Sequence, residues 1–248
     1  MKQTIQLIAI CCILFWANAC DKPPATDHAG NAVLSSVMTV SVATIGKQHN
    51  TALGRYQTNY GFNTVPASLT KAQVETIINS ANQVMIDLGI LTGTTAAQQT
   101  ADDMTMYTSL GFFDASDNLM SQEEIIIIML GQIQNAAIKT AHVNMINYTG
   151  NDFGTYAMGQ FNALLANATL STSEKGMITG AKSIFSASLD FWNTLPAEAM
   201  NGGRQALMDE MGYMVGFIMA KANGQTDGMA TVFGLYNGIR LSTMAGMM

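Results

Sequence analysis

The sequence predicts an all-α fold, with a single helical-bundle domain over residues 31–248, and three observations support this. First, Thr70, Ser121 and Ser171 are each followed three residues later by Gln or Glu, which is the pattern of a helix capping box. Second, apolar residues recur at helical spacing after each of these caps. Third, small residues recur at every fourth position near the C-terminus, which places them along one stripe of a helix.

The first expected helix runs from about residue 31 to about residue 60. Five side chains continue an apolar face at helical spacing: Ile45, His49, Leu53, Tyr56 and Tyr60. The β-branched stretch at 37–42 offers a strand as the alternative. No second segment pairs with it convincingly, so we expect one long helix.

The second expected helix begins after Thr70, and Gly89 can end it in a left-handed cap. Its apolar face consists of Val74, Ile77, Ile78, Ala81, Val84, Met85 and Leu88. The segment 91–120, in contrast, is broken by Thr-rich and Asp-rich turns. It predicts at most a short helix at about 100–110.

A third helix is expected to follow Ser121 and to continue to about Tyr148. It begins with six apolar residues at 125–130. Such a continuous run directly after a cap predicts a central helix that is buried on most sides.

Two more helices are expected before the C-terminal region. A short one covers 153–165, and a longer one follows Ser171 and ends near Asn193. Pro196 acts as a stop beyond that helix and is a candidate first residue of the next one.

The C-terminal region predicts a helical hairpin, with helices at about 203–223 and 227–247. Six small residues are candidates for close helix packing: Gly212, Gly216, Ala220, Gly234, Gly238 and Ser242. A hairpin that inserts into a membrane is the alternative function for this pattern. Lys221 and Arg240 weigh against insertion, because a charge at bilayer depth costs at least ~2.5 kcal/mol.

The N-terminus has the organisation of an export signal. Lys2 precedes an apolar run at 5–17, which is shorter than the about 20 residues that a membrane-spanning helix needs. The run ends in Ala17-Asn18-Ala19-Cys20, which resembles the lipobox of bacterial lipoprotein signal peptides. This resemblance implies that 1–19 is removed, that Cys20 receives lipid, and that 20–30 is a flexible spacer. Soluble secretion after cleavage behind Ala19 is the alternative.

The composition narrows the classes of function. Only 11% of the residues are charged and the net charge is −6, so no basic surface is available for nucleic acid. After removal of the leader, Cys20 would be the only one of three cysteines left, which excludes disulfides within the domain. The 19 methionines are scattered through apolar positions, which favours core filling over copper binding.

Candidate reactive residues are few. His49 lies on an apolar helix face beside Asn50, and His142 lies on the helix that follows Ser121. The two histidines could hold zinc together with a carboxylate if their helices packed against each other, but no spacing requires it. The sequence contains no nucleophile elbow, phosphate loop or zinc-protease motif. We therefore expect no cofactor and no enzymatic activity.

Three segments resemble a loose group of uncharacterised bacterial envelope lipoproteins. These are Ile45–Leu53, which contains a Gly-x-x-His-Asn-x-x-Leu pattern, Leu170–Lys175, and the Gly-spaced C-terminus. The resemblance implies a lipid-anchored protein of the bacterial cell envelope, with the outer membrane favoured over the inner one. It also implies that His49 and Asn50 have a structural or interaction role.

The leading expectation for function is therefore a non-enzymatic binding or scaffolding role at a membrane. The membrane would be reached through lipid on Cys20, and the partner would be an envelope protein or a surface ligand. The alternative is a membrane-active effector, pore-forming or bacteriocin-like, that uses the C-terminal hairpin. A metal-dependent enzyme at His49 and His142 is a third hypothesis.

Overall fold

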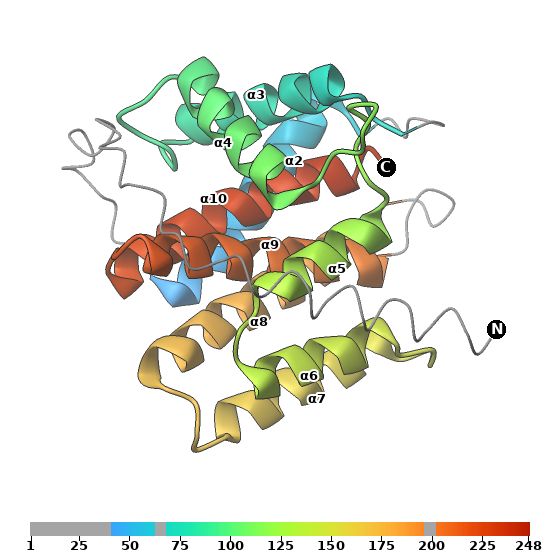
Figure 1. The fold of residues 1–248 in the computed structure, drawn as a ribbon, viewed down its shortest axis with the longest axis vertical. Coiled ribbons are helices and arrows are strands. Elements are labelled where there is room, and N and C mark those ends of the chain that lie inside the picture. The colour runs from blue at the N-terminus through green and yellow to red at the C-terminus, as the bar shows by residue number, and fades with distance from the viewer. Residues whose placement is uncertain (1–40, 63–67, 196–201) are drawn as a thin grey trace. The chain divides into compact units, whose positions relative to one another are not determined.

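The computed structural model describes residues 41–62, 68–195 and 202–248, and it confirms the all-α prediction for them. These residues form nine α-helices and one 3-10 turn, with two isolated β-bridges and no strand (Figure 1). The helices are α2 (Ile45–Tyr60), α3 (Lys71–Asp87), α4 (Ala96–Leu110), α5 (Gln122–Gln132), α6 (Ala136–Ile146), α7 (Phe153–Ala166), α8 (Thr172–Trp192), α9 (Gly202–Ala222) and α10 (Asp227–Ala245).

The predicted C-terminal hairpin, α9 and α10, forms the interior of the bundle. Residues 205–217 of α9 are all buried, and so is α10 from 230 to 245 except Phe233. Helices α8 and α5 pack on α9, while α3 and α2 pack on α10. In Figure 1 the hairpin crosses the middle of the described part, with α3 and α4 on one side and α6 and α7 on the other.

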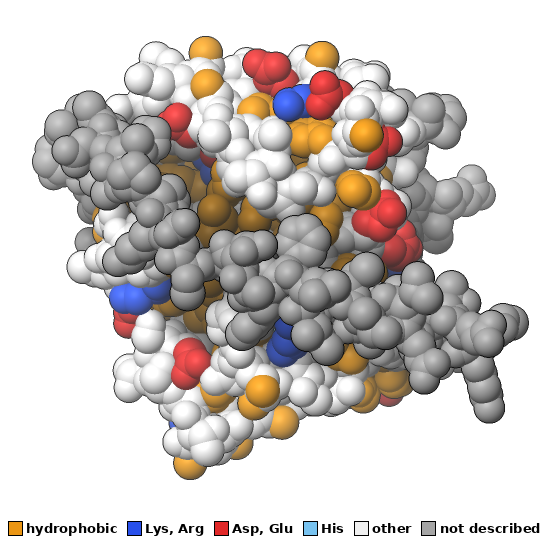
Figure 2. Space-filling view, viewed as in Figure 1, with side chains coloured by type: hydrophobic (Ala, Val, Ile, Leu, Met, Phe, Trp, Pro, Cys, Tyr) orange, Lys and Arg blue, Asp and Glu red, His pale blue; other side chains and the backbone are white. Residues whose placement is uncertain are grey.

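The surface carries few charges, as the composition predicts. Figure 2 shows scattered Asp, Glu, Lys and Arg side chains on one face, with uncharged polar groups between them. Among the described residues, no helix has both the length and the apolar character that a membrane span requires.

The three predicted capping boxes all form. At Thr70, Ser121 and Ser171 the side-chain oxygen accepts from the backbone N–H three residues later, and the Gln or Glu side chain accepts from the cap's own N–H. Each cap satisfies N–H groups that would otherwise lack a partner at the start of a helix. Helices α3 and α8 begin directly after two of these caps, as expected, and both, like α7, end close to the expected residues. Gly89 has the left-handed φ of 67°.

The first helix is shorter than predicted. Ser41 has an extended backbone, with φ −70° and ψ 132°, and its side chain caps the 3-10 turn Val42–Thr44. Helix α2 begins only at Ile45, so a continuous helix from residue 31 is wrong. Residues 31–40, which include most of the alternative strand, lie outside the described residues.

Helix α4 is longer than predicted, because it begins at Ala96 instead of about residue 100. Thr95 caps it by accepting from the backbone N–H of Gln98. Its buried face includes Thr100 and Asp103, and these polar side chains obscured the apolar period in the sequence.

The long helix predicted after Ser121 is in fact two helices. Ile133 has an extended backbone, with φ −80° and ψ 112°, and this ends α5. The Asn135 side chain then accepts from the N–H groups of Ala137 and Ile138 and caps α6. The prediction that the helix is buried on most sides is also wrong, since Ile127 is 62% exposed.

The predictions for the N-terminal segment and for Pro196 concern residues that the structure does not describe. The signal peptide 1–19, Cys20 and the spacer up to residue 30 belong to this group, and so does Pro196.

Candidate functional site

The small-residue stripes lie at the contact between α9 and α10. A Cβ on Gly216 would be 2.8 Å from the Phe233 carbonyl oxygen, and a Cβ on Gly234 would be 2.7 Å from the Tyr213 ring. Gly212 faces Leu241, and Gly238 faces the backbone oxygen of Asp209. Ala220 and Ser242 are also buried. The glycines let the two backbones approach closely, and this approach brings polar side chains of both helices into the core.

His49 and Asn50 connect α2 to two other helices. His49 is fully buried, and its Nε2 lies 2.7 Å from Oγ of Ser242 on α10. Its Nδ1 lies 3.2 Å from Oδ1 of Asn50, whose amide Nδ2 donates to the Ala187 carbonyl on α8 at 2.7 Å. Gly46, one turn earlier, allows α2 to approach α8, because a Cβ there would be 2.5 Å from the Ser183 carbonyl.

Asp209 on α9 lies beside His49 in this core. Its Oδ2 accepts from Nε1 of Trp192 at 2.8 Å and is 3.9 Å from Nε2 of His49. Burial raises the pKa of Asp209 to about 7. Burial also lowers the pKa of His49 to about 4, although Asn50 and Gly238 oppose the shift. His49 is therefore neutral near pH 7, while the Asp209 carboxyl group keeps its proton to a much higher pH than an exposed aspartate does.

The proton on neutral His49 can be placed from its neighbours. Because Asn50 uses its N–H group on Ala187, its Oδ1 faces Nδ1 of His49 and requires that nitrogen to donate. Nε2 of His49 faces the Ser242 hydroxyl, which donates its proton to the Gly238 carbonyl at 2.8 Å.

This connectivity of hydroxyl, imidazole and amide is that of a nucleophile relay. Ser242 and His49 are both 0% exposed, however, and neither surface hollow considered below is lined by them. A substrate carbonyl has no approach to Ser242, so the group acts in packing.

His142 forms a second buried pair, with Glu210 of α9. Its Nε2 lies 3.1 Å from Oε1 of Glu210, and its Nδ1 donates to the Ile138 carbonyl at 2.8 Å. Burial lowers the pKa of His142, but the facing carboxylate outweighs burial, so the net direction is upward. Burial raises the pKa of Glu210, and the imidazole offsets only part of the rise.

The structure does not bring His49 and His142 together in one site. His49 faces Asp209 and His142 faces Glu210. These two carboxylates are consecutive residues of α9, so their side chains point about 100° apart around the helix. Within the described ranges no group of three His, Cys, Asp or Glu side chains is arranged to hold a metal ion. The zinc hypothesis therefore has no site there.

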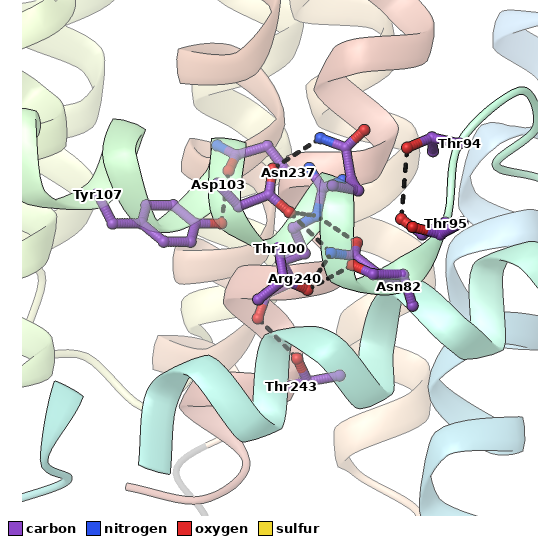
Figure 3. A network of polar contacts seen from close by, with 11 residues as sticks. Asn82, Thr94, Thr95, Thr100, Asp103, Tyr107, Asn237, Arg240 and Thr243 are labelled. Carbon is purple, nitrogen blue, oxygen red and sulfur yellow. Dashed lines mark hydrogen bonds and ion pairs between the residues drawn. The ribbon is translucent and has the colours of Figure 1, made fainter. Parts of the chain in front are cut away.

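A third buried group was missed in the sequence and is centred on Arg240 of α10 (Figure 3). Its Nε donates to Oδ1 of Asn82 on α3 and forms an ion pair with Oδ2 of Asp103 on α4, both at 2.8 Å. Asn82 also donates to Asp103 at 2.9 Å and to Thr100 at 3.1 Å. Burial raises the pKa of Asp103, and Arg240 and Asn82 oppose that rise.

The same group continues across the hairpin through Asn237. Its Oδ1 accepts from the Tyr107 hydroxyl at 2.9 Å, and its Nδ2 donates to the Gly212 carbonyl at 2.7 Å. In the sequence, this group could be suspected only because Asp103 and Arg240 are charged residues within stretches of helical periodicity. Only the fold shows that the two charges meet.

Two hollows open on the surface, away from these buried groups. One lies between α6 and α7 and is lined mainly by small and amide side chains. The other, of about 1030 Å³, lies between α7 and α8 where α9 begins.

No protein-family model, curated protein sequence or solved structure matches this chain.

Proposed function

We propose that this protein is a lipid-anchored bacterial envelope protein whose helical domain binds a partner and does not catalyse a reaction. Acylation of Cys20 after removal of 1–19 would supply the anchor. Several acyl chains, at about 0.8 kcal/mol per buried CH₂, give stable membrane attachment. The residues at 20–30 would act as the spacer between the membrane and the bundle.

One observation carries the binding role. The ionisable side chains with reactive potential, His49, His142, Asp209, Glu210 and Arg240, are buried and face one another in closed groups. A catalytic group must touch its substrate, whereas the contacts of these groups within residues 41–62, 68–195 and 202–248 are with neighbouring helices. The surface of the bundle and its hollows are then the places where this domain meets other molecules.

The anchor is tested with the full-length chain expressed in a bacterial host. We expect the intact mass to show acylation on the mature N-terminus and the protein to fractionate with membranes. A Cys20→Ser variant should lose the acyl mass and leave the membrane fraction. The proposal is wrong if mass and fractionation of the variant equal those of the wild type.

A membrane-active effector is the second candidate, and one observation favours it. The α9–α10 hairpin forms the centre of the bundle, so opening the outer helices would expose its buried apolar residues together with Asp209, Glu210 and Arg240. Dye release from liposomes by the full-length protein tests this function. If the hairpin inserts, the wild type and the Cys20→Ser variant should release dye to the same extent. If neither protein releases dye, the effector function is wrong.

A further inference from the structure

The hollow between α7 and α8 is larger than the hollow between α6 and α7. The buried polar groups described above do not line it. Its volume of about 1030 Å³ lies at the upper end of the about 300–1000 Å³ that small-molecule sites occupy. It is lined by the N-terminal half of α7, the C-terminal half of α8 and the first residues of α9. Such a space admits a ligand of several rings.

The charges around this hollow disfavour an anion. Asp152 and Asp190 line it, and no Arg, Lys or His is among its described lining residues. The Lys182 ammonium reaches its edge, where Nζ donates to Oδ1 of Asn162 at 2.7 Å. Phosphate or carboxylate ligands would meet two carboxylates and one ammonium that is already engaged.

The uncharged lining residues suit hydroxyl groups. Three amides and two hydroxyls face the hollow: Asn151, Asn162, Asn193, Thr155 and Ser186. An amide both donates and accepts, and a carboxylate accepts twice. A sugar ring presents neighbouring hydroxyls that also donate and accept, so it can satisfy both kinds of partner.

Aromatic rings lie beside these polar groups. Phe153 lines the hollow. Tyr148 does not line it, but donates its hydroxyl to the lining residue Asp152. The Tyr148 ring stacks on Tyr156, with centroids 4.1 Å apart and planes 11° apart. Flat rings next to hydrogen-bonding side chains can cover the apolar C–H face of a sugar.

Gly159 keeps the α7 wall of the hollow open. It is an exposed helical residue, and a Cβ added there would meet nothing within 4 Å. A glycine inside a helix costs about 0.5–1 kcal/mol relative to alanine. No described packing contact requires glycine at position 159, and a larger side chain there would extend into the hollow that Gly159 lines.

We propose that the hollow between α7 and α8 binds a neutral oligosaccharide. The carboxylates and amides would bind its hydroxyls, and the Phe153 ring would cover a ring face of the sugar. The inference rests on the proposed binding role, for which it supplies the class of ligand.

Calorimetric titration of the full-length protein in detergent tests the proposal. The probes are maltotriose and tri-N-acetylchitotriose, with spermidine as a cation and sialyllactose as an anion. We expect saturable binding of at least one neutral trisaccharide. Asp190→Asn should weaken it about tenfold, as expected for the loss of a charged acceptor.

Gly159→Leu and Gly131→Leu form a matched pair for this test. Both glycines are exposed helical residues with nothing within 4 Å of an added Cβ, but only Gly159 lines the hollow. Gly159→Leu should abolish binding and Gly131→Leu should retain it, with both variants folded by circular dichroism.

The proposal is overturned if neither trisaccharide binds, if only spermidine or sialyllactose binds, or if Gly159→Leu binds as the wild type does. These outcomes are independent of the anchor. A Cys20→Ser protein that binds sugar but has the mass and fractionation of the wild type would refute the tether alone, and an acylated protein that binds no sugar would refute this inference alone.

Discussion

At the scale of single residues, the most informative feature is a pair of buried groups with opposite responses to pH. The folded state raises the pKa of Asp209 from 3.8 to about 7, so folded protein holds a proton that the unfolded chain has lost between these values. It lowers the pKa of His49 from 6.5 to about 4, so the unfolded chain holds a proton that the folded protein lacks. Their contributions to stability therefore have opposite slopes between pH 4 and 6.5.

The Asp209→Asn variant should reveal the response of His49. In the wild type the Asp209 contribution is fully present below pH 3.8 and is lost as the pH rises through about 7. Without it, the free energy of unfolding should rise more steeply with pH between 4 and 6.5 than in the wild type. Urea unfolding at pH 4.5, 5.5, 6.5 and 7.5 measures this, with exposed Asp190→Asn as the control. Equal pH dependence in Asp209→Asn and the wild type would contradict the assignment.

The His49→Gln variant should show the opposite change. The His49 contribution is present above pH 6.5 and is lost as the pH falls through about 4, and it is worth about 3 kcal/mol at most. Relative to the wild type, the variant should gain stability on acidification from pH 6.5 to 4.5. The same urea series tests this, and a variant that loses stability faster than the wild type on acidification would refute it.

At the scale of elements, the close contact of α9 and α10 depends on glycine at particular positions. Gly234 and Gly216 each face backbone atoms of the partner helix, so a side chain cannot be accommodated by a change of rotamer alone. Other helical glycines, such as Gly131, face open space. The same residue type therefore has opposite energetic roles in this bundle.

The Gly234→Ala and Gly131→Ala variants should separate these two roles. The new Cβ at 234 would lie 2.7–2.8 Å from the Tyr213 ring and carbonyl oxygen, and such overpacking costs about 1–3 kcal/mol. At 131 alanine should be neutral or stabilise by up to about 1 kcal/mol, because it favours the helix. Chemical denaturation measures both changes. Equal effects at the two positions would contradict the packing role of the stripe.

Local sequence patterns predicted most of the helices but not every break. Thr70, Ser121 and Ser171 are followed by partners within their own first turn, so the start of each helix could be predicted without tertiary information. The break at Ile133 could not, because Asn135 caps α6 in a stretch whose apolar pattern continues on both sides. The Asn135 amide also donates to Glu174 at 2.7 Å, a contact that depends on the packing of a distant helix.

The candidate sites were less predictable than the helices. The sequence places His49 on an apolar helix face beside Asn50, but Asp209 and Ser242, which it contacts, lie far from it in sequence. Arg240 was noted only as a charge that disfavours membrane insertion. Its pairing with Asp103 requires α4 and α10 to be placed side by side, and no local spacing contains that information.

At the scale of the whole described domain, Arg240 joins three helices through one side chain. It connects α10 to Asp103 of α4 and to Asn82 of α3, with both partners buried (Figure 3). The α3–α4 pair is thereby fixed to the central hairpin by charge as well as by apolar packing. Surface ion pairs such as Arg204–Glu123 have no comparable role.

Replacing Arg240 with Met should loosen the α3–α4 pair selectively. The change leaves the Asp103 carboxyl group buried without its cation, a situation that costs about 3–5 kcal/mol. Amide hydrogen exchange should accelerate in α4 more than in α7. Arg204→Met, at an exposed pair, is the control and should change stability by less than about 1 kcal/mol. Uniform acceleration across all helices would contradict the local role of Arg240.

The order of helices along the chain has a consequence for biogenesis. The outer helices α2–α8 are synthesised first, but the hairpin that fills the space between them arrives last. In a nascent chain that has reached residue 201, the apolar faces of the outer helices lack the hairpin on which they pack in the folded bundle. Assembly must therefore wait until residues 202–248 have been translated, and a ribosome that stalls before this point leaves a product for proteases.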